Sequence, residues 1–172
     1  MDAQGSLFDF EPRYCIDTNV VVSFLRGTDD EHYGADVFAP QWALIERLIA
    51  SGVIVAPRRV ERELTDWRRT IPSLKGWLKK NRHMFRDVQS SEQLVLAKRI
   101  VNQYPVYGSS LNYLGDLEAM TLAAALGIAL ISLEHAHAQP SQRRPKIPNV
   151  CKEFGVEHLT LPAFLRREGF GS

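Results

Sequence analysis

Four acidic residues occupy positions in the sequence that would bring them to one edge of a predicted sheet. Asp17 ends the first apolar run of the sequence, and Glu134 comes two residues after the run 128–132. Glu63 lies in the helix predicted after the second apolar run, and Asp116 begins the helix predicted to lead into the third. In an open parallel sheet, ligands bind outside the carboxyl ends of the strands. We therefore expect the four side chains to converge there.

Carboxylates gathered in one place repel one another, so a fold that gathers them is expected to bind a cation. Oxygen ligands without a matching set of His or Cys favour Mg²⁺ or Mn²⁺ over zinc. A metal held in this way activates water and polarises a phosphoryl oxygen, which is the chemistry of phosphodiester hydrolysis. The pattern predicts that Asp17, Glu63, Asp116 and Glu134 are metal ligands and catalytic residues.

Each of these acids also has a simpler structural interpretation. Asp17 would serve as a helix cap, and Asp116 would suit the first turn of a helix through the helix dipole alone. Glu134 would have the same alternative as Asp116. Glu63 would serve as a surface residue of its helix, and Glu61 is expected to face elsewhere and be solvated. The joint placement of the four acids favours the functional interpretation.

The elements that must position these acids alternate along the chain. Short apolar runs predict strands at 14–16, 53–56, 128–132 and 156–160, and helical periodicity fills the segments between them. This order is typical of an α/β domain with a central parallel sheet of about four to five strands flanked by helices. We expect a flexible tail over residues 1–12 and one domain over 13–172.

The segment 67–104 is predicted to be a helical insertion that packs as a separate arm or lid over one end of the sheet. Its first helical stripe runs from Ile71 to Phe85.

The helix that follows the first strand is expected to begin after Thr18, whose side chain would cap it.

The net charge of +1 conceals an asymmetry along the chain. Residues 1–36 carry eight acidic and two basic side chains, whereas residues 58–86 carry ten Lys or Arg and three acids. A basic segment of this density suits a phosphate backbone, and Arg58, Arg59, Arg68 and Arg69 are the predicted RNA-binding residues. A pair of solvated helices with positive charges is the alternative that this pattern leaves open.

Several aromatic side chains are candidates for stacking on unpaired bases. These are Trp67, Trp77, Tyr104 and Tyr107, and Tyr107 is expected to be the most exposed because its segment is rich in Gly and Ser. Trp77 fits a helical stripe and is predicted to be a core residue.

The remaining composition indicates an ordinary globular protein. Hydrophobic residues make up 45% of its 172 positions, and no apolar run approaches the roughly 20 residues that span a bilayer. The acidic, polar start does not resemble a secretory signal. We expect Cys15 and Cys151 to be reduced thiols in a cytoplasmic protein, and His135 and His137 to be exposed loop residues rather than zinc ligands.

Four segments carry a resemblance to a known family. Segment 14–19 (YCIDTN) resembles the opening motif of PIN domains, 60–64 (VEREL) the second, and 115–119 (GDLEA) the third. Segment 131–134 (ISLE) stands where that family commonly has Thr-x-Asp. The order and distances fit across residues 13–160, and the ending around 146–156 further resembles a little-characterised PIN-like subfamily of small prokaryotic proteins.

The resemblance implies a Mg²⁺- or Mn²⁺-dependent endoribonuclease. In many small prokaryotic members it also implies the toxin of a type II toxin–antitoxin pair, similar to VapC, with an antitoxin protein as partner. Asn19 would orient Asp17 or a metal-bound water, and Ser132 would contact a phosphate or the metal shell. The sequence departs from the family pattern at two positions, with Ser132 for Thr and Glu134 for Asp.

Other functions remain open from the sequence. A PIN-like module that binds nucleic acid or protein without cleaving is the main alternative, and a DNA nuclease is the second. A phosphatase with an aspartyl nucleophile is disfavoured, because Asn19 stands where a second aspartate would be needed. A second copy of the chain, forming a homodimer, is a further candidate partner.

Overall fold

The computed structural model describes residues 10–27, 33–87 and 90–171. Within them, five parallel strands form one sheet in the order β3-β2-β1-β4-β5. The strands are β1 (Tyr14–Ile16), β2 (Ile54–Pro57), β3 (Phe85–Arg86), β4 (Ala129–Ser132) and β5 (His158–Thr160). The α/β fold with a central parallel sheet is confirmed.

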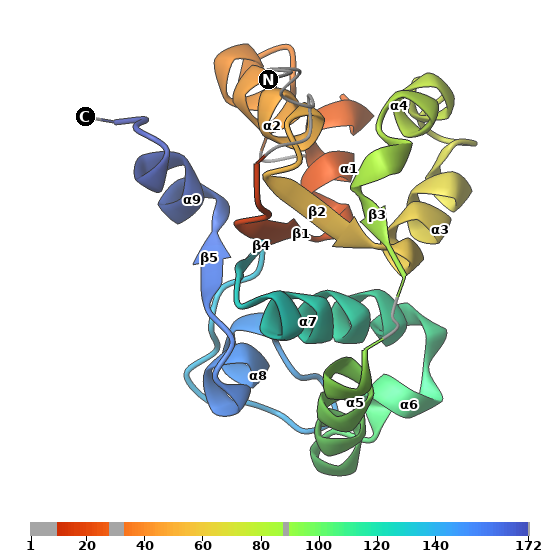
Figure 1. Ribbon diagram of the computed structural model, residues 1–172, viewed down its shortest axis with the longest axis vertical. Coiled ribbons are helices and arrows are strands. Elements are labelled where there is room, and N and C mark those ends of the chain that lie inside the picture. Colours follow the sequence, from red (N-terminus) through yellow and green to blue (C-terminus); the bar gives the residue numbers. More distant parts are fainter. Residues whose placement is uncertain (1–9, 28–32, 88–89, 172) are drawn as a thin grey trace, which may run out of the picture.

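Helices cover both faces of the sheet (Figure 1). One face carries α1 (Thr18–Arg26), α2 (Ala39–Ala50), α3 (Arg58–Trp67), α4 (Leu74–Lys80) and α9 (Leu161–Arg167). The other face carries α5 (Ser91–Gln103), α6 (Val106–Ser109), α7 (Leu114–Leu126) and α8 (Ile147–Phe154). Two short 3-10 turns, Arg82–Met84 and Leu111–Tyr113, complete the regular structure of the described residues.

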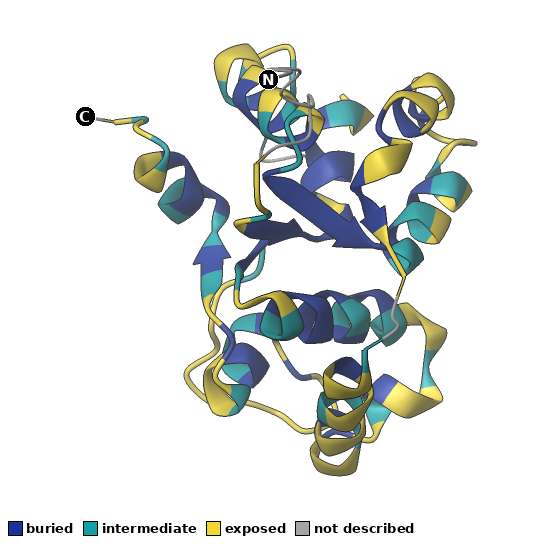
Figure 2. Ribbon diagram, viewed as in Figure 1, coloured by how far each residue is buried: buried dark blue, intermediate teal, exposed yellow. Residues whose placement is uncertain are grey.

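The central strands β1, β2 and β4 are buried on both faces because alternate side chains enter two different cores. Tyr14 and Ile16 belong to the cluster under α1 to α4, whereas Cys15 between them belongs to the cluster under α7 and α8. Val55 and Leu130 join Cys15 from the neighbouring strands. Figure 2 shows β1, β2, β4 and much of α7 as buried. This two-sided burial explains why the three central strands are continuous apolar runs.

The strand order creates a switch point at the centre of the sheet. The chain runs from β1 to β2 and β3 in one direction, then returns to place β4 on the other side of β1. Right-handed connections accordingly put α1 and α2 on one face and α5 and α7 on the other. Ligands of open α/β sheets bind at such a switch point, beyond the carboxyl ends of the strands. Here that point lies between β1 and β4.

Asp17, rather than Thr18, caps α1, so the cap expected at Thr18 is wrong by one residue and the capping role considered for Asp17 is confirmed. Asp17 has an extended backbone and its carboxylate accepts a hydrogen bond from the Thr18 amide at 2.8 Å. Its own amide donates to the Ile131 carbonyl of β4 at 3.1 Å. The Asp17 side chain is therefore held at the sheet edge by both the helix start and the neighbouring strand.

The segment 67–104 is largely helical, but it does not form a separate arm or lid. Leu74 and Trp77 of α4 belong to the main core. The helix predicted to reach Phe85 ends earlier, where the Asn81 side chain donates to the Trp77 carbonyl at 2.9 Å. Phe85 then enters a short edge strand paired with Ala56, which buries its ring.

Some expectations concern residues that the structure does not describe. The flexible tail predicted for residues 1–12 falls mainly on residues 1–9, which lie outside the described residues.

Both cysteines are described, and each is a buried free thiol. Among the described residues, none of the helices combines the length and apolar character needed to cross a bilayer.

Candidate active site

A pocket of about 500 Å³ opens beside the switch point of the sheet. We call it the acid pocket, and it is lined by Asp17, Thr18, Asn19, Arg59, Arg62, Glu63, Asp66, Trp67, Leu111, Asn112 and Asp116. Three of the four predicted acids therefore share one cavity, built from the starts of α1 and α7 and one side of α3. The predicted residue Asn19 is exposed and lies on the same wall.

Asp17 and Asp116 carry the strongest electrostatic perturbation of the pocket. Burial, followed by the charge of Glu63, raises the pKa of Asp17 to about 7. Burial, followed by the charges of Asp17 and Glu134, raises the pKa of Asp116 to about 9, against a smaller opposite effect of Lys146. Two carboxyl groups in this situation need a proton or a cation to be stable together.

Glu63 is held between the starts of two helices. The Thr18 hydroxyl donates to its Oε2 at 2.5 Å. Gly115 in the first turn of α7 approaches so closely that a Cβ there would lie 2.2 Å from Oε1. Burial raises the pKa of Glu63, while the Thr18 hydrogen bond and Arg59 oppose that rise. Gly115 is therefore required for the space that the Glu63 carboxylate occupies.

Glu134 and Ser132 stand behind the pocket rather than on its wall. The Glu134 carboxylate accepts a hydrogen bond from the Ile147 amide at 2.7 Å, which ties it to the start of α8. Ser132 is fully buried, and its hydroxyl lies 2.7 Å from Nε2 of His158 and 3.2 Å from the Glu134 amide. Burial lowers the pKa of His158 to about 4, so this imidazole is neutral near pH 7. The charge of Glu134 adds to the rise in the pKa values of Asp17 and Asp116.

The donor set of the site suits a hard divalent cation. Asp17, Glu63, Asp116 and Glu134 all offer carboxylate oxygens, the ligands that Mg²⁺ and Mn²⁺ prefer. Within the described ranges, however, no three His, Cys, Asp or Glu side chains are close enough together to hold an ion as they stand. The hydrogen bonds to Thr18 and Ile147 hold two of the four carboxylates in other contacts.

Helix α3 has two polar faces. One face lines the acid pocket, the other points away from it, and the arginines of α3 are divided between the two. Arg59, Arg62, Glu63 and Asp66 recur at helical spacing and line the acid pocket. Arg58 lies on the other polar face, where it pairs with Glu61 at 3.3 Å and Asp87 at 3.1 Å.

Of the predicted RNA-binding residues, only Arg59 reaches the acid pocket. Arg62 was not among those residues, although its position three residues after Arg59 is a signal in the sequence that it shares the same face.

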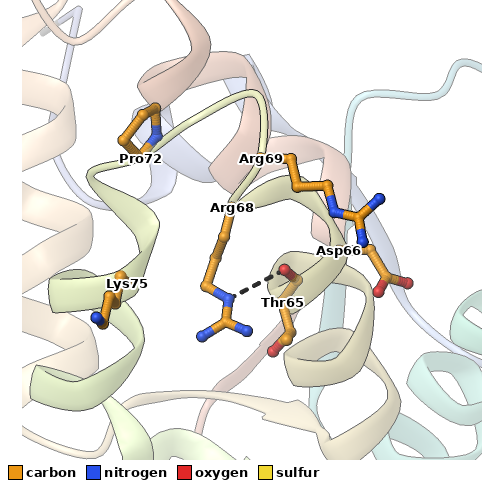
Figure 3. Close-up of a pocket in the computed structure, with 6 residues that line it drawn as sticks. All are labelled: Thr65, Asp66, Arg68, Arg69, Pro72 and Lys75. Atoms are coloured by element: carbon orange, nitrogen blue, oxygen red, sulfur yellow. Dashed lines mark hydrogen bonds between the residues drawn. The ribbon is translucent and has the colours of Figure 1, made fainter.

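A second cavity continues from the acid pocket along α3. It has a volume of about 640 Å³ and is lined by Thr65, Asp66, Arg68, Arg69, Pro72 and Lys75, and we call it the basic pocket. Figure 3 shows Arg68 between Thr65 of α3 and Lys75 of α4, with its Nε donating to the Thr65 carbonyl at 3.1 Å. Asp66 lines both cavities. The predicted residues Arg68 and Arg69 therefore lie beside the acid pocket rather than in it.

The aromatic residues are arranged differently from the prediction. Tyr107 is fully buried, so its predicted exposure is wrong, and Tyr104 is buried as well. The Gly- and Ser-containing segment around Tyr107 folds into α6 and packs its ring edge-on against Tyr113 at 5.5 Å. Trp77 is a core residue, as predicted, and Trp67 lines the acid pocket.

Two further residues of the acid pocket had no signal in the sequence. Leu111 and Asn112 are exposed and come from the 3-10 turn before α7. The exposed loop position predicted for His135 and His137 is confirmed.

The fold and the site together define a single-sheet α/β protein with a carboxylate-rich pocket at its switch point. The chain belongs to the family described as "Domain of unknown function (DUF4411)", whose model matches residues 14–171. Comparison with curated proteins gave no match.

The contact between Gly115 and Glu63 leads to a first prediction. Gly115→Ala should displace the Glu63 carboxylate from Thr18, because the new Cβ would overlap it. The obstacle is the end of a flexible side chain, and alanine favours helices by up to about 1 kcal/mol over glycine. We therefore expect a folded protein of near wild-type melting temperature. If the acid pocket binds Mn²⁺ through these carboxylates, as proposed below, its affinity measured by calorimetry should fall at least about tenfold.

Gly76→Ala on α4 is the matched control, since nothing lies within 4 Å of the Cβ it would add. That variant should keep wild-type Mn²⁺ affinity. Equal affinity in Gly115→Ala and Gly76→Ala would contradict a role for the position of Glu63.

Proposed function

We propose that this protein is a metal-dependent endoribonuclease that hydrolyses RNA phosphodiester bonds. The observation that carries the proposal is the pair Asp17, which is buried, and Asp116, which is partly buried, on the wall of one open pocket. Burial first, and neighbouring carboxylate charges second, raise the pKa values of both side chains. Arginines on the same pocket wall suit an anionic substrate. The resemblance of four sequence segments to PIN domains supports the same function.

Mg²⁺ or Mn²⁺ is the proposed cofactor, and Asp17 and Asp116 would hold it together with Glu63 and Glu134. When bound, such a cation supplies Lewis acidity for phosphodiester hydrolysis. Arg59 and Arg62 would bind the phosphates on either side of the scissile bond through charge-assisted hydrogen bonds.

The remaining pocket residues would position the substrate. Asn19, next to Asp17 on the wall, would orient the attacking water or the phosphate with its amide. Trp67 is partly exposed in the same pocket and would stack on an unpaired base. The basic pocket would bind phosphates further along the strand.

The test is cleavage of an unstructured RNA with Mn²⁺, with Mg²⁺ or with EDTA, followed on a denaturing gel. We expect internal cleavage with either metal and none with EDTA. A single-stranded DNA of the same sequence is the parallel substrate. Cleavage of the DNA but not of the RNA would show that the protein is a DNA nuclease and not a ribonuclease.

A binding module without catalysis is the second candidate. The observation that favours it is the separation of the carboxylates, since Glu63 and Glu134 are held in hydrogen bonds elsewhere. Such a module would retain RNA in a filter-binding assay, show no cleavage with either metal, and show no stabilisation by Mn²⁺.

The basic pocket leads to a prediction about binding. Replacing Arg68 and Arg69 by Glu should weaken RNA binding for all sequences, because phosphate contacts release counterions. The slope of log affinity against log salt should become flatter by about one or more. The control is the same charge change at Lys98 and Arg99 on α5, which covers the other face of the sheet. An unchanged slope in the Arg68/Arg69 variant would place the nucleic acid elsewhere.

The biological role that we propose is the toxin of a type II toxin–antitoxin pair in the cytoplasm, and it rests on the PIN resemblance. An antitoxin would cover the acid pocket and place an Arg or Lys against Asp17 or Asp116. Expression of the wild-type chain alone should slow growth, whereas expression of Asp17→Asn should not. Equal growth of the two strains would remove the toxin role and leave the nuclease proposal intact.

A further inference from the structure

The hydroxyl of Tyr107 is a buried polar group that lacks a partner among the described residues. Tyr107 is fully buried, and its hydroxyl oxygen makes no hydrogen bond there. The ring is fixed edge-on between Tyr104, at a centroid distance of 6.3 Å, and Tyr113, at 5.5 Å. Buried tyrosine hydroxyls usually find a partner, because losing water without gaining a hydrogen bond costs free energy. This exception therefore requires an explanation.

The surroundings of the hydroxyl point to the acids of the proposed site. Helix α6 packs against α7, whose first turn carries Asp116. Burial, followed by the charges of Asp116 and Glu134, raises the pKa of the Tyr107 hydroxyl. Tyr107 is not part of the acid pocket wall. Tyr107 therefore lies in the interior beside the start of α7, since its ring packs against Tyr113, the residue that caps this helix.

We propose that Tyr107 is a positioning residue of the cation site, whose hydroxyl donates a hydrogen bond to the Asp116 carboxylate when a divalent cation binds. The inference rests on the cation site of the proposed function. A carboxylate ligand uses one oxygen on the metal and keeps lone pairs for a hydrogen-bond donor. Such a donor sets the direction of the ligand, and its loss typically weakens metal affinity ten- to a hundredfold.

A purely structural role for Tyr107 predicts a different outcome. In that case the ring fills the core and the hydroxyl contributes nothing to metal binding. Tyr107→Phe separates the two roles, because it keeps the ring contacts with Tyr104 and Tyr113 and removes only the oxygen. Tyr104→Phe is the matched control on the preceding turn, since the Tyr104 hydroxyl has a partner of its own in Glu153.

The experiment measures Mn²⁺ binding by titration calorimetry and melting temperature in EDTA for wild type, Tyr107→Phe and Tyr104→Phe. Tyr107→Phe should melt at or above the wild-type temperature in EDTA, because it removes an unpartnered polar group. Its Mn²⁺ affinity should be about ten- to a hundredfold weaker than that of wild type. Tyr104→Phe should keep wild-type Mn²⁺ affinity.

Two negative outcomes are distinguishable. Wild-type Mn²⁺ affinity in Tyr107→Phe would overturn the positioning role and leave the proposed function standing. A wild-type protein that binds no Mn²⁺ would overturn the cation site itself, and the positioning role with it. Equal weakening of Mn²⁺ binding in both tyrosine variants would also overturn the proposal, since the effect would then come from the packing of α6.

Discussion

Asp17→Asn and Asp116→Asn should each lower the rate of RNA cleavage at least about a hundredfold, the size of effect seen when one electrostatic partner of a transition state is lost. Each change removes a negative charge from the acid pocket and alters the volume of the side chain little. The cap of α1 should survive in Asp17→Asn, because asparagine is as good an N-cap residue as aspartate. Its amide oxygen can accept the Thr18 hydrogen bond that the carboxylate now accepts at 2.8 Å.

The measurement is single-turnover cleavage with saturating Mn²⁺, together with circular dichroism to verify the fold. Asp87→Asn is the matched control, because Asp87 is an exposed aspartate that pairs with Arg58 on the other polar side of α3. It should cleave at the wild-type rate. A folded Asp17→Asn or Asp116→Asn protein that also cleaves at the wild-type rate would show that the residue is a structural cap and that the site lies elsewhere.

The second large effect is expected on stability, without substrate. In EDTA, Asp116→Asn should melt at a higher temperature than wild type near pH 9. The pKa values of Asp17 and Asp116 are raised in the folded protein, to about 7 and about 9. The folded state therefore binds protons more tightly than the unfolded state, in which an aspartate titrates near 3.9. Proton binding by these two aspartates therefore contributes to the free energy of unfolding. The contribution is fully present below about pH 4 and is lost as the pH rises through 7 and 9.

The pH dependence separates this explanation from a general change in packing. Asp116→Asn removes one of the two titrations and weakens the other, so its advantage over wild type should grow from pH 5 to pH 9. At pH 9 we expect a difference of about 2 kcal/mol, or on the order of 5 °C for a domain of this size. A variant that melts below wild type at every pH would indicate that Asp116 stabilises α7 through the helix dipole instead.

Mn²⁺ should reverse the order of the melting temperatures of wild type and Asp116→Asn. At about one hundred times its dissociation constant, a bound ligand stabilises the folded state by roughly 2.7 kcal/mol. Wild type should show this gain, whereas Asp116→Asn has lost a proposed ligand and should gain less. An equal gain in both proteins would exclude Asp116 as a ligand. Stability and function would then be independent at this residue rather than opposed.

The strands that form the centre of the sheet were predictable because their cause is local. β1, β2 and β4 are buried on both faces, so each is a continuous apolar run bounded by polar or turn-forming residues. β3 was missed because a strand of two residues has no periodicity of its own. Only its pairing with β2 makes Phe85 extended. The same contact explains why the segment 67–104 joins the core.

The arginines of α3 and the tyrosines of α6 show where prediction from composition fails. A run of basic residues indicates that a surface is positive, but the rotation of α3 decides that Arg59 and Arg62 face the acid pocket and Arg58 does not. Likewise, Gly and Ser around Tyr107 indicate a loop, whereas packing against Tyr113 buries the ring. Side-chain direction depends on the neighbouring elements, which are distant in the sequence.

The sequence by itself determined the α/β class and the convergence of Asp17, Glu63 and Asp116 on one pocket. The physical reason is that parallel strands share an edge for their carboxyl ends, so acids that follow a strand or lie in the first turns of an adjacent helix are brought toward that edge. Only the tertiary structure decided that Glu63 is held by Thr18 and Gly115, and that Glu134 is tied to the start of α8. These contacts join residues from 13 to about 50 positions apart, and their geometry depends on how whole helices pack.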